Sequence, residues 1–331
     1  MPPSFAEAIH LVSSPSAAGW LIHAGARRTR IHCSADVLTS GPCDVDPVRH
    51  EELRRTWDTE GWKGPLGLED LRGAIAGGEP VVVWGTRAYS DLVFLWWTLH
   101  GLGLVGAGGP RFLLARPQPE DPLTEVGGST PEELRIALAS ARPVSDDEWR
   151  EGPDLWIKFA SPSPFAFDEA RRRSSSVFPE LTTTADLHGA WFPRLTDWSL
   201  HLSELDEVLL GAFDDSWRPT CELLQKLHPG RLARLVEPFD PLFSIYRLRA
   251  WATKGVLERE ALADQDPYAQ DRFRATDRTR ALLCRGLDDV GDAPQLYVGG
   301  CVVNDPAWPW VRIEDDSGWR LALQASVHRT T

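Results

Sequence analysis

The segment IHLVSSPSAAGW, residues 9–20, decides the fold of the first part of this chain. A short apolar strand runs into a serine-rich loop, and small residues then lead into an apolar run typical of a helix. Backbone N–H groups at a helix start bind anions, and neighbouring hydroxyl groups add donors. Alternatively, the small residues only let the helix pack closely on the strand. The predicted anion site comprises Ser13, Ser14, Ser16, Ala17 and Gly19.

Further apolar runs predict the rest of a parallel sheet. The run at residues 79–84 is continuously apolar after its first two residues, as expected for a strand buried on both faces. Residues 30–33 and 111–115 predict two more strands, and the segments between the runs have helical spacing. We therefore expect an α/β domain over residues 1–125, a layered domain whose parallel sheet pairs the run at 79–84 with the first strand.

The middle of the chain changes character. Thr130 stands before Pro131 and two acidic residues, Ser145 opens a capping box, and Ser203 begins a further helix. Residues 126–215 are therefore predicted to be mostly helical.

Residues 216–331 have the element order of a winged-helix-like domain. Two short helices over residues 221–236 precede a third helix, which Asp240 caps and Gly255 ends. Residues 256–258 and then residues 272–286 suggest a strand, a turn and a closing helix.

In DNA-binding winged helices, the third helix enters the major groove. Here that helix would offer Arg247, Arg249 and Lys254. The acidic residues beyond it are Glu258, Glu260, Asp264 and Asp266. They would repel phosphate, and the whole chain has a net charge of −13. We therefore expect this domain to pack or to contact a protein partner, without appreciable binding to nucleic acid.

Composition indicates a globular protein. A length of 331 residues is typical of about two domains, and 42% hydrophobic with 25% charged residues suits a chain with a core. The five cysteines lack tight spacing, no signal-peptide pattern is present, and the apolar run at residues 92–104 is too short to span a bilayer. We expect a cytoplasmic protein with reduced thiols and no membrane contact.

Three short blocks and the tail form an ordered set of motifs. The blocks fall on residues 10–19, 36–42 and 85–91. The tail motifs are residues 276–286, residues 296–300 and the pair Trp308 and Trp310. In this order they resemble the bacterial domain-of-unknown-function 1835 family, in the version with a winged-helix-like end. The resemblance implies the fold but no established activity.

The chain departs from that family's pattern at its polar positions. Thr39 stands where the second block has histidine, and Gly85 and Thr86 stand where the third has glutamate and histidine. Arg87 replaces an acidic residue there. If those groups perform acid–base or metal chemistry in the family, these changes remove much of it, which favours binding over catalysis.

Two more loops are expected on the same edge of the sheet as the first. Asp36, Thr39 and Gly41 follow the second strand, and ligands of open α/β sheets bind at the carboxyl edge of the strands. Asp36 would hold a ribose or a cation, or alternatively would be a cap or turn residue.

The third loop contains Thr86, Arg87 and Asp91, after the strand that ends at residue 84. Arg87 would contact an anionic ligand. Alternatively, it would form an ion pair with Asp91, four residues further on. Together, the three loops are expected to border one cleft.

Other common sites have no support in the sequence. The first loop is not a Walker loop, because no Gly-Lys-Ser/Thr follows it, and it lacks Gly-x-Gly-x-x-Gly; no Gly-x-Ser-x-Gly elbow appears in the chain. His32, Cys33, Cys43 and His50 do not have a usual zinc spacing, so no metal is predicted. The fifteen tryptophans are expected in the core rather than stacked on bases.

The sequence thus predicts an accessory or regulatory protein that binds an anionic small molecule or a nucleotide and contacts a protein partner through its C-terminal domain. The alternative is an enzyme acting on a phosphorylated or acylated small molecule, with Asp36, Arg87 and Asp91 as its polar set. A DNA-binding regulator is the third hypothesis. The sequence identifies no cofactor.

Overall fold

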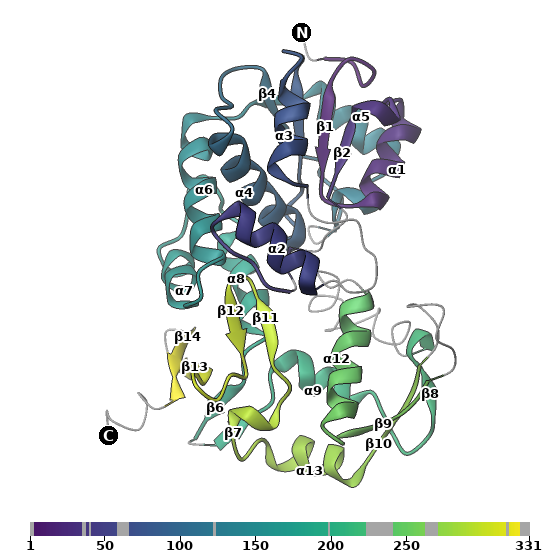
Figure 1. Cartoon of the computed structure of the whole chain (residues 1–331), viewed down its shortest axis with the longest axis vertical. Helices are drawn as coiled ribbons and strands as arrows, with labels where there is room; N and C mark the ends of the chain where they lie inside the picture. The colour runs from purple at the N-terminus through teal and green to yellow at the C-terminus, as the bar shows by residue number, and fades with distance from the viewer. Residues whose placement is uncertain are drawn as a thin grey trace. The chain divides into compact units, whose positions relative to one another are not determined.

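The computed structural model shows a mixed α/β fold in two compact units (Figure 1). It describes residues 3–34, 38–39, 41–57, 66–121, 124–197, 199–222, 241–261, 271–315 and 318–324. The first unit comprises Met1–Ser161 and Ala170–Leu181, and the second comprises Pro162–Glu169 and Thr182–Thr331. The predicted regions were divided near residues 125 and 215, whereas here residues 126–161 belong to the first unit.

A five-stranded sheet forms the centre of the first unit, in the order β2-β1-β3-β4-β5. Its strands are β1 (Ile9–Val12), β2 (Ile31–Cys33), β3 (Val81–Trp84), β4 (Phe112–Ala115) and β5 (Arg142–Pro143). The first four are parallel and β5 is antiparallel. Leu11 lies opposite Val83, so the predicted parallel pairing of these strands is confirmed. The strand order reverses between β1 and β3, which makes their carboxyl ends the topological switch point of the sheet.

Helices cover both faces of this sheet, as in layered α/β domains. They are α1 (Pro15–Ala24), α2 (Pro47–Trp57), α3 (Leu68–Ile75), α4 (Tyr89–Leu104), α5 (Pro131–Ala139) and α6 (Asp146–Phe159). Figure 1 shows α1 and α5 on one side and α3, α4 and α6 on the other. Leu21 of α1 and Leu134 of α5 share a core with Val82 and Trp84 of β3. Residues 91–102 of α4 are all buried, as expected for a helix without a polar face.

The structure adds elements that the sequence did not predict. The first helix begins at Pro15, because the Ser14 hydroxyl caps it and accepts from Ala17 N at 3.2 Å. Helix α3 follows a Gly/Pro break, and β5 has only two residues. Neither is long enough for a clear periodic pattern.

The described residues of the second unit form three sheets and several helices. Its helices are α8 (Leu181–Gly189), α9 (Glu204–Gly211), α12 (Pro241–Thr253) and α13 (Asp277–Arg285), and α7 (Phe165–Arg172) connects it to the first unit. A four-stranded sheet has the order β14-β13-β6-β7, from β6 (Arg194–Thr196), β7 (Ser199–His201), β13 (Trp310–Asp315) and β14 (Gly318–Leu323). The expected helical character of residues 126–215 is therefore incomplete, because β6 pairs with β13, which lies far along the chain.

After α9 in the chain comes an antiparallel sheet with the strand order β8-β10-β9. Its strands are β8 (Arg218–Pro219), β9 (Leu257–Glu260) and β10 (Arg272–Ala275), and a separate hairpin joins β11 (Leu296–Val298) to β12 (Cys301–Val303). The predicted third and closing helices are confirmed as α12 and α13, the latter capped by Thr276. Most of residues 221–236, together with Asp240, Asp264 and Asp266, lies outside the described residues.

The basic side chains of α12 do not form the free surface that the sequence suggested. Arg247 is only 2% exposed because its guanidinium is paired with Asp206 inside the unit. Arg249 Nε donates to Asp271 Oδ2 at 2.6 Å, and Lys254 Nζ donates to the Gly291 carbonyl at 2.9 Å. The interpretation of Arg247 as a residue that could contact phosphate is therefore wrong.

Two further expectations concern the packing of tryptophans in the core and the absence of a segment that spans a bilayer. Core packing is confirmed for six fully buried tryptophans, Trp84, Trp96, Trp97, Trp156, Trp191 and Trp251, whereas Trp20, Trp57 and Trp308 are exposed. Among the helices of the described residues, none is long and apolar enough to cross a bilayer.

Candidate functional site

Asp91 joins the loops that follow β1 and β3. Its fully buried carboxylate accepts hydrogen bonds from Ser13 Oγ at 2.5 Å, from Thr86 Oγ1 at 2.8 Å and from Thr86 N at 3.1 Å. A fourth donor, Val126 N, lies 2.8 Å from Asp91 Oδ2. The structure thus brings the first and third predicted loops together at the switch point.

The same geometry restricts what Asp91 can do. Burial raises the pKa of its carboxyl group, and the hydrogen bonds from Ser13, Thr86 and Val126 oppose that rise. A carboxylate offers about four lone-pair sites, and four donors already approach this one. The arrangement favours a role for Asp91 in holding the loops together over a role in acid–base catalysis.

The start of α1 lies against a distant part of the chain, the turn η2 (Val126–Gly128). A Cβ added to Gly127 would stand 3.0 Å from Ser16 Cβ, 3.1 Å from Ser14 Oγ and 3.3 Å from Ala17 N. The missing side chain of Gly127 therefore permits this close approach. The segment 126–128 therefore forms one wall of the predicted anion site, whereas Gly19, one turn further along α1, is exposed.

A second acidic group lies at the start of α4. Ser90, in the first turn of this helix, donates its hydroxyl to the Glu125 carboxylate. Because helix starts carry partial positive charge, they stabilise nearby carboxylates. Glu125 directly precedes η2, so the starts of α1 and α4 both face the segment 125–128.

Arg87 contacts Glu180 rather than Asp91. Its Nε lies 3.4 Å from Glu180 Oε1, and Arg116 Nη1 lies 3.3 Å from the same oxygen. The alternative of an Arg87–Asp91 ion pair is wrong, because Asp91 turns inward to its four donors. Arg87 is 55% exposed, whereas Arg116 and Glu180 are 19% and 12% exposed.

Arg116 is the residue that the sequence analysis missed. It directly follows β4, whose Ala115 pairs with Trp84 of β3. Like Arg87 after β3, Arg116 follows the carboxyl end of a parallel strand, where a cation could contact an anionic ligand. The two arginines and Glu180 carry one net positive charge at the carboxyl ends of neighbouring strands.

The second predicted loop has a different neighbourhood. Thr39 is buried, and Gly41 adopts φ +83° where an added Cβ would lie 2.4 Å from Arg54 Nη1 and 2.7 Å from the Trp57 ring of α2. Asp36 lies outside the described residues. Their membership of one shared cleft stays a prediction.

His10 of β1 is a core residue. His10 Nδ1 accepts from Trp84 Nε1 at 3.0 Å while its Nε2 lies 3.0 Å from the Phe5 carbonyl, and burial lowers the His10 pKa. Within the described part of the chain, no group of three or more His, Cys, Asp or Glu residues could hold a metal ion.

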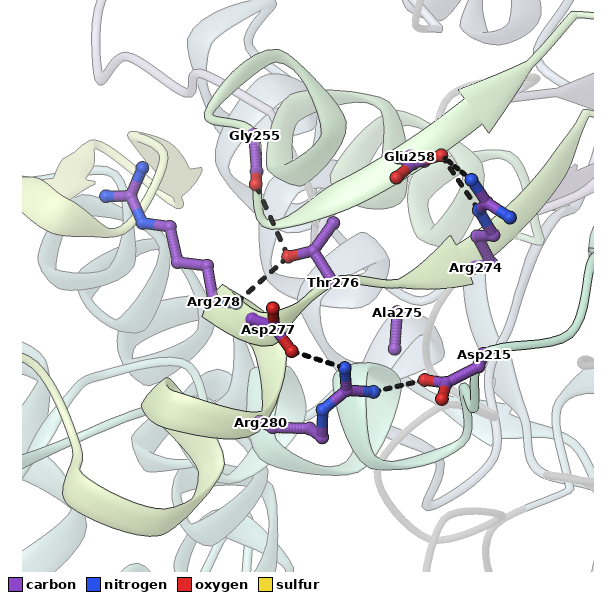
Figure 2. Close-up of a pocket in the computed structure, with 9 residues that line it drawn as sticks. All are labelled: Asp215, Gly255, Glu258, Arg274, Ala275, Thr276, Asp277, Arg278 and Arg280. Atoms are coloured by element: carbon purple, nitrogen blue, oxygen red, sulfur yellow. Dashed lines mark hydrogen bonds and ion pairs between the residues drawn. The ribbon is translucent and has the colours of Figure 1, made fainter.

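A separate pocket of about 470 Å³ lies at the start of α13 in the second unit (Figure 2). Its lining residues are Asp215, Gly255, Glu258, Arg274, Ala275, Thr276, Asp277, Arg278 and Arg280. The arginines are already engaged: Arg280 bonds to Asp215 and Asp277, and Arg274 bonds to Glu258 (Figure 2). With three acidic and three basic side chains, this pocket carries no net charge.

Comparisons with known protein families and with curated proteins give no match to this chain. The resemblance to the domain-of-unknown-function 1835 family therefore stays a prediction.

Proposed function

We propose that the first unit binds an anionic small molecule, such as a nucleotide or a phosphorylated metabolite, at the carboxyl edge of its sheet. The main support is that the starts of α1 and α4 lie together at the switch point between β1 and β3. Hydrogen bonds from Ser13 and Thr86 to Asp91 link the two helix starts. Open α/β sheets bind their ligands at this place. Helix starts favour negative charge, and Arg87 adds an exposed cation.

The placement of the chain's own acids favours binding over catalysis at this edge. Asp91 and Glu125 both lie by the first turn of α4, where the helix dipole stabilises a carboxylate. Because Asp91 is engaged by four donors, the edge has the features of a binding site more than of a catalytic one. Because the edge favours binding over catalysis, we propose an accessory or regulatory role for the protein that depends on binding the ligand.

The test is thermal unfolding of the full chain with nucleotides and phosphorylated metabolites. A ligand at roughly 100 times its dissociation constant stabilises the folded state by about 2.7 kcal/mol, which raises the melting temperature measurably. Arg87→Gln should reduce that shift. The matched control is Arg135→Gln, since Arg135 on α5 is similarly exposed at 50% and pairs with Glu132. A panel without any shift, or equal shifts in both variants, would contradict the proposal.

For the second unit, we propose a winged-helix-like arrangement that serves packing or protein contact. Helix α12 precedes the antiparallel strands β9 and β10, and β8 flanks β10 on the other side, which is the order of a winged helix. The engagement of Arg247, Arg249 and Lys254 by protein groups supports protein contact over a grip on DNA phosphates.

Fluorescence anisotropy with labelled duplex DNA tests this second proposal. We expect no submicromolar binding at 50 mM salt, because a phosphate grip needs free cations and weakens steeply with salt. Tight, salt-sensitive binding that Arg249→Gln abolishes would instead favour the DNA-binding regulator.

A further inference from the structure

Arg116 carries two buried N–H groups without a hydrogen-bond partner in the described part of the chain. Its Nη1 donates to Glu180 Oε1 at 3.3 Å, whereas Nε and Nη2 are buried and unpaired. Folded proteins rarely leave buried donors unpaired, because the lost hydration is not recovered. The unpaired atoms therefore mark a place where an acceptor is missing.

The two unpaired nitrogens belong to one edge of the planar guanidinium. The Nε–H and Nη2–H bonds point in nearly the same direction, and this fork matches the two oxygens of a carboxylate or a phosphate. Glu180 occupies the opposite side of the group through Nη1. One bidentate edge of Arg116 is thus buried without a hydrogen-bond partner among the described residues.

Charge and position agree with that assignment. Arg116 and Arg87 follow neighbouring parallel strands, and both contact Glu180 Oε1. Two guanidinium groups and one carboxylate sum to a single positive charge, which one singly charged oxyanion would neutralise. Since isolated buried charge is costly, neutralisation favours a ligand with one negative charge at this point.

We propose that the Nε/Nη2 edge of Arg116 binds one oxyanion of the ligand, a carboxylate or a phosphate group, with Arg87 on the exposed side. This inference rests on the proposed function, because it assigns a binding group at the same edge of the sheet. Both nitrogens are buried, so the oxyanion enters when the groups that cover them move aside.

The experiment measures probe binding to the full chain by calorimetry at constant ionic strength. One arm uses acetate and succinate, and the other uses inorganic phosphate and a nucleoside monophosphate. Arg116→Lys keeps the positive charge but removes the fork, so the affinity for the binding arm should fall by about 10-fold or more. Circular dichroism and the melting temperature without probe show whether the variant is folded.

Glu180→Gln provides a variant that should gain affinity. It preserves the side chain's shape while raising the net charge of the cluster by one, so the oxyanion should bind more tightly. The matched control is Glu148→Gln, since Glu148 is also buried and paired with an arginine, Arg142, elsewhere in the first unit.

The outcomes distinguish a failure of the proposed function from a failure of the inference about Arg116. If no probe binds the unmodified chain, the proposed function and this inference both fail. If a probe binds and Arg87→Gln weakens it while Arg116→Lys does not, the inference is overturned and the proposed function stands. Failure of Glu180→Gln to tighten binding relative to Glu148→Gln also overturns the inference. The arm that responds identifies the oxyanion as a carboxylate or a phosphate.

Discussion

Arg247 and Asp206 form a buried bidentate ion pair in the second unit. Arg247 Nε lies 2.7 Å from Asp206 Oδ1, Nη2 lies 2.5 Å from Oδ2, and both side chains are 1% exposed. Trp251 Nε1 also donates to Oδ1 at 2.7 Å, and Arg247 Nη1 donates to the Pro294 carbonyl at 2.7 Å. The pair therefore ties α9 to α12 and to the segment before β11.

Removal of the charge on Asp206 should destabilise the second unit strongly. Asp206→Asn leaves the Arg247 guanidinium buried without a counter-charge, so we expect a loss of about 3 kcal/mol in the free energy of unfolding. Urea denaturation followed by tryptophan fluorescence measures this loss. Arg280→Ala is the control, because Arg280 is half exposed and its ion pairs are screened by water, so its effect should be small. Similar losses in the two variants would contradict the buried geometry.

Asp91 should tolerate asparagine far better than alanine. The asparagine oxygen can accept from Thr86 and Val126, and the Ser13 hydroxyl can rotate to accept from the new amide, so Asp91→Asn should cost about 1 kcal/mol. Asp91→Ala leaves several buried donors unpaired and should cost about 3 kcal/mol or more. Chemical denaturation at pH 7 distinguishes the two variants. If alanine costs no more than asparagine, the four hydrogen bonds to the Asp91 carboxylate do not hold the loops together.

The difference in the free energy of unfolding between the unmodified chain and Asp91→Asn should depend on pH. Because burial raises the pKa of Asp91 in the folded state, the folded chain holds this proton more tightly than the unfolded chain. The stability of the unmodified chain relative to Asp91→Asn should therefore increase as the pH falls through the raised pKa towards the ordinary value of 3.8. An opposite slope would show that the hydrogen bonds outweigh burial.

The sequence predicted the features that depend on local pattern. Strands buried on both faces must be apolar throughout, so the pairing of β1 with β3 could be anticipated from the run ending at Trp84. The inward turn of Asp91 and the burial of Arg247 could not. Their partners Val126 and Asp206 lie 35 and 41 positions away, and no periodicity in the sequence reports such contacts.

His50 should make the first unit sensitive to acid. Its ring is fully buried near the rings of Trp97 and Trp156, accepts a hydrogen bond from Asp44 N at 3.3 Å through Nδ1, and burial lowers its pKa to about 4. The unfolded chain therefore binds the proton more tightly than the folded chain. Stability is retained above pH 6.5 and falls as the pH decreases towards 4, by about 3 kcal/mol from this residue.

The measurement for His50 is the free energy of unfolding between pH 4 and pH 7. His50→Gln should flatten the acid limb of this curve, because glutamine does not titrate. The control His23→Gln changes an exposed histidine in α1 and should leave the curve unchanged. An acid limb that both variants share would assign the sensitivity to other groups, such as the buried His10 and His100, whose pKa values are also lowered.

Gly286 and Gly255 provide a matched pair for the close approach at the end of α13. Both have positive φ, +83° and +71°, so alanine is strained at either position. A Cβ at Gly286 would lie 2.1 Å from the Leu200 carbonyl oxygen, whereas a Cβ at Gly255 meets nothing within 4 Å. That carbonyl accepts from Leu287 N at 2.8 Å and cannot move without breaking the bond. We expect Gly255→Ala to cost about 1 kcal/mol, from backbone strain alone. Gly286→Ala should cost at least about 2 kcal/mol more in urea denaturation. Equal costs would mean that the contact between residues 286 and 200 is looser than the structure shows.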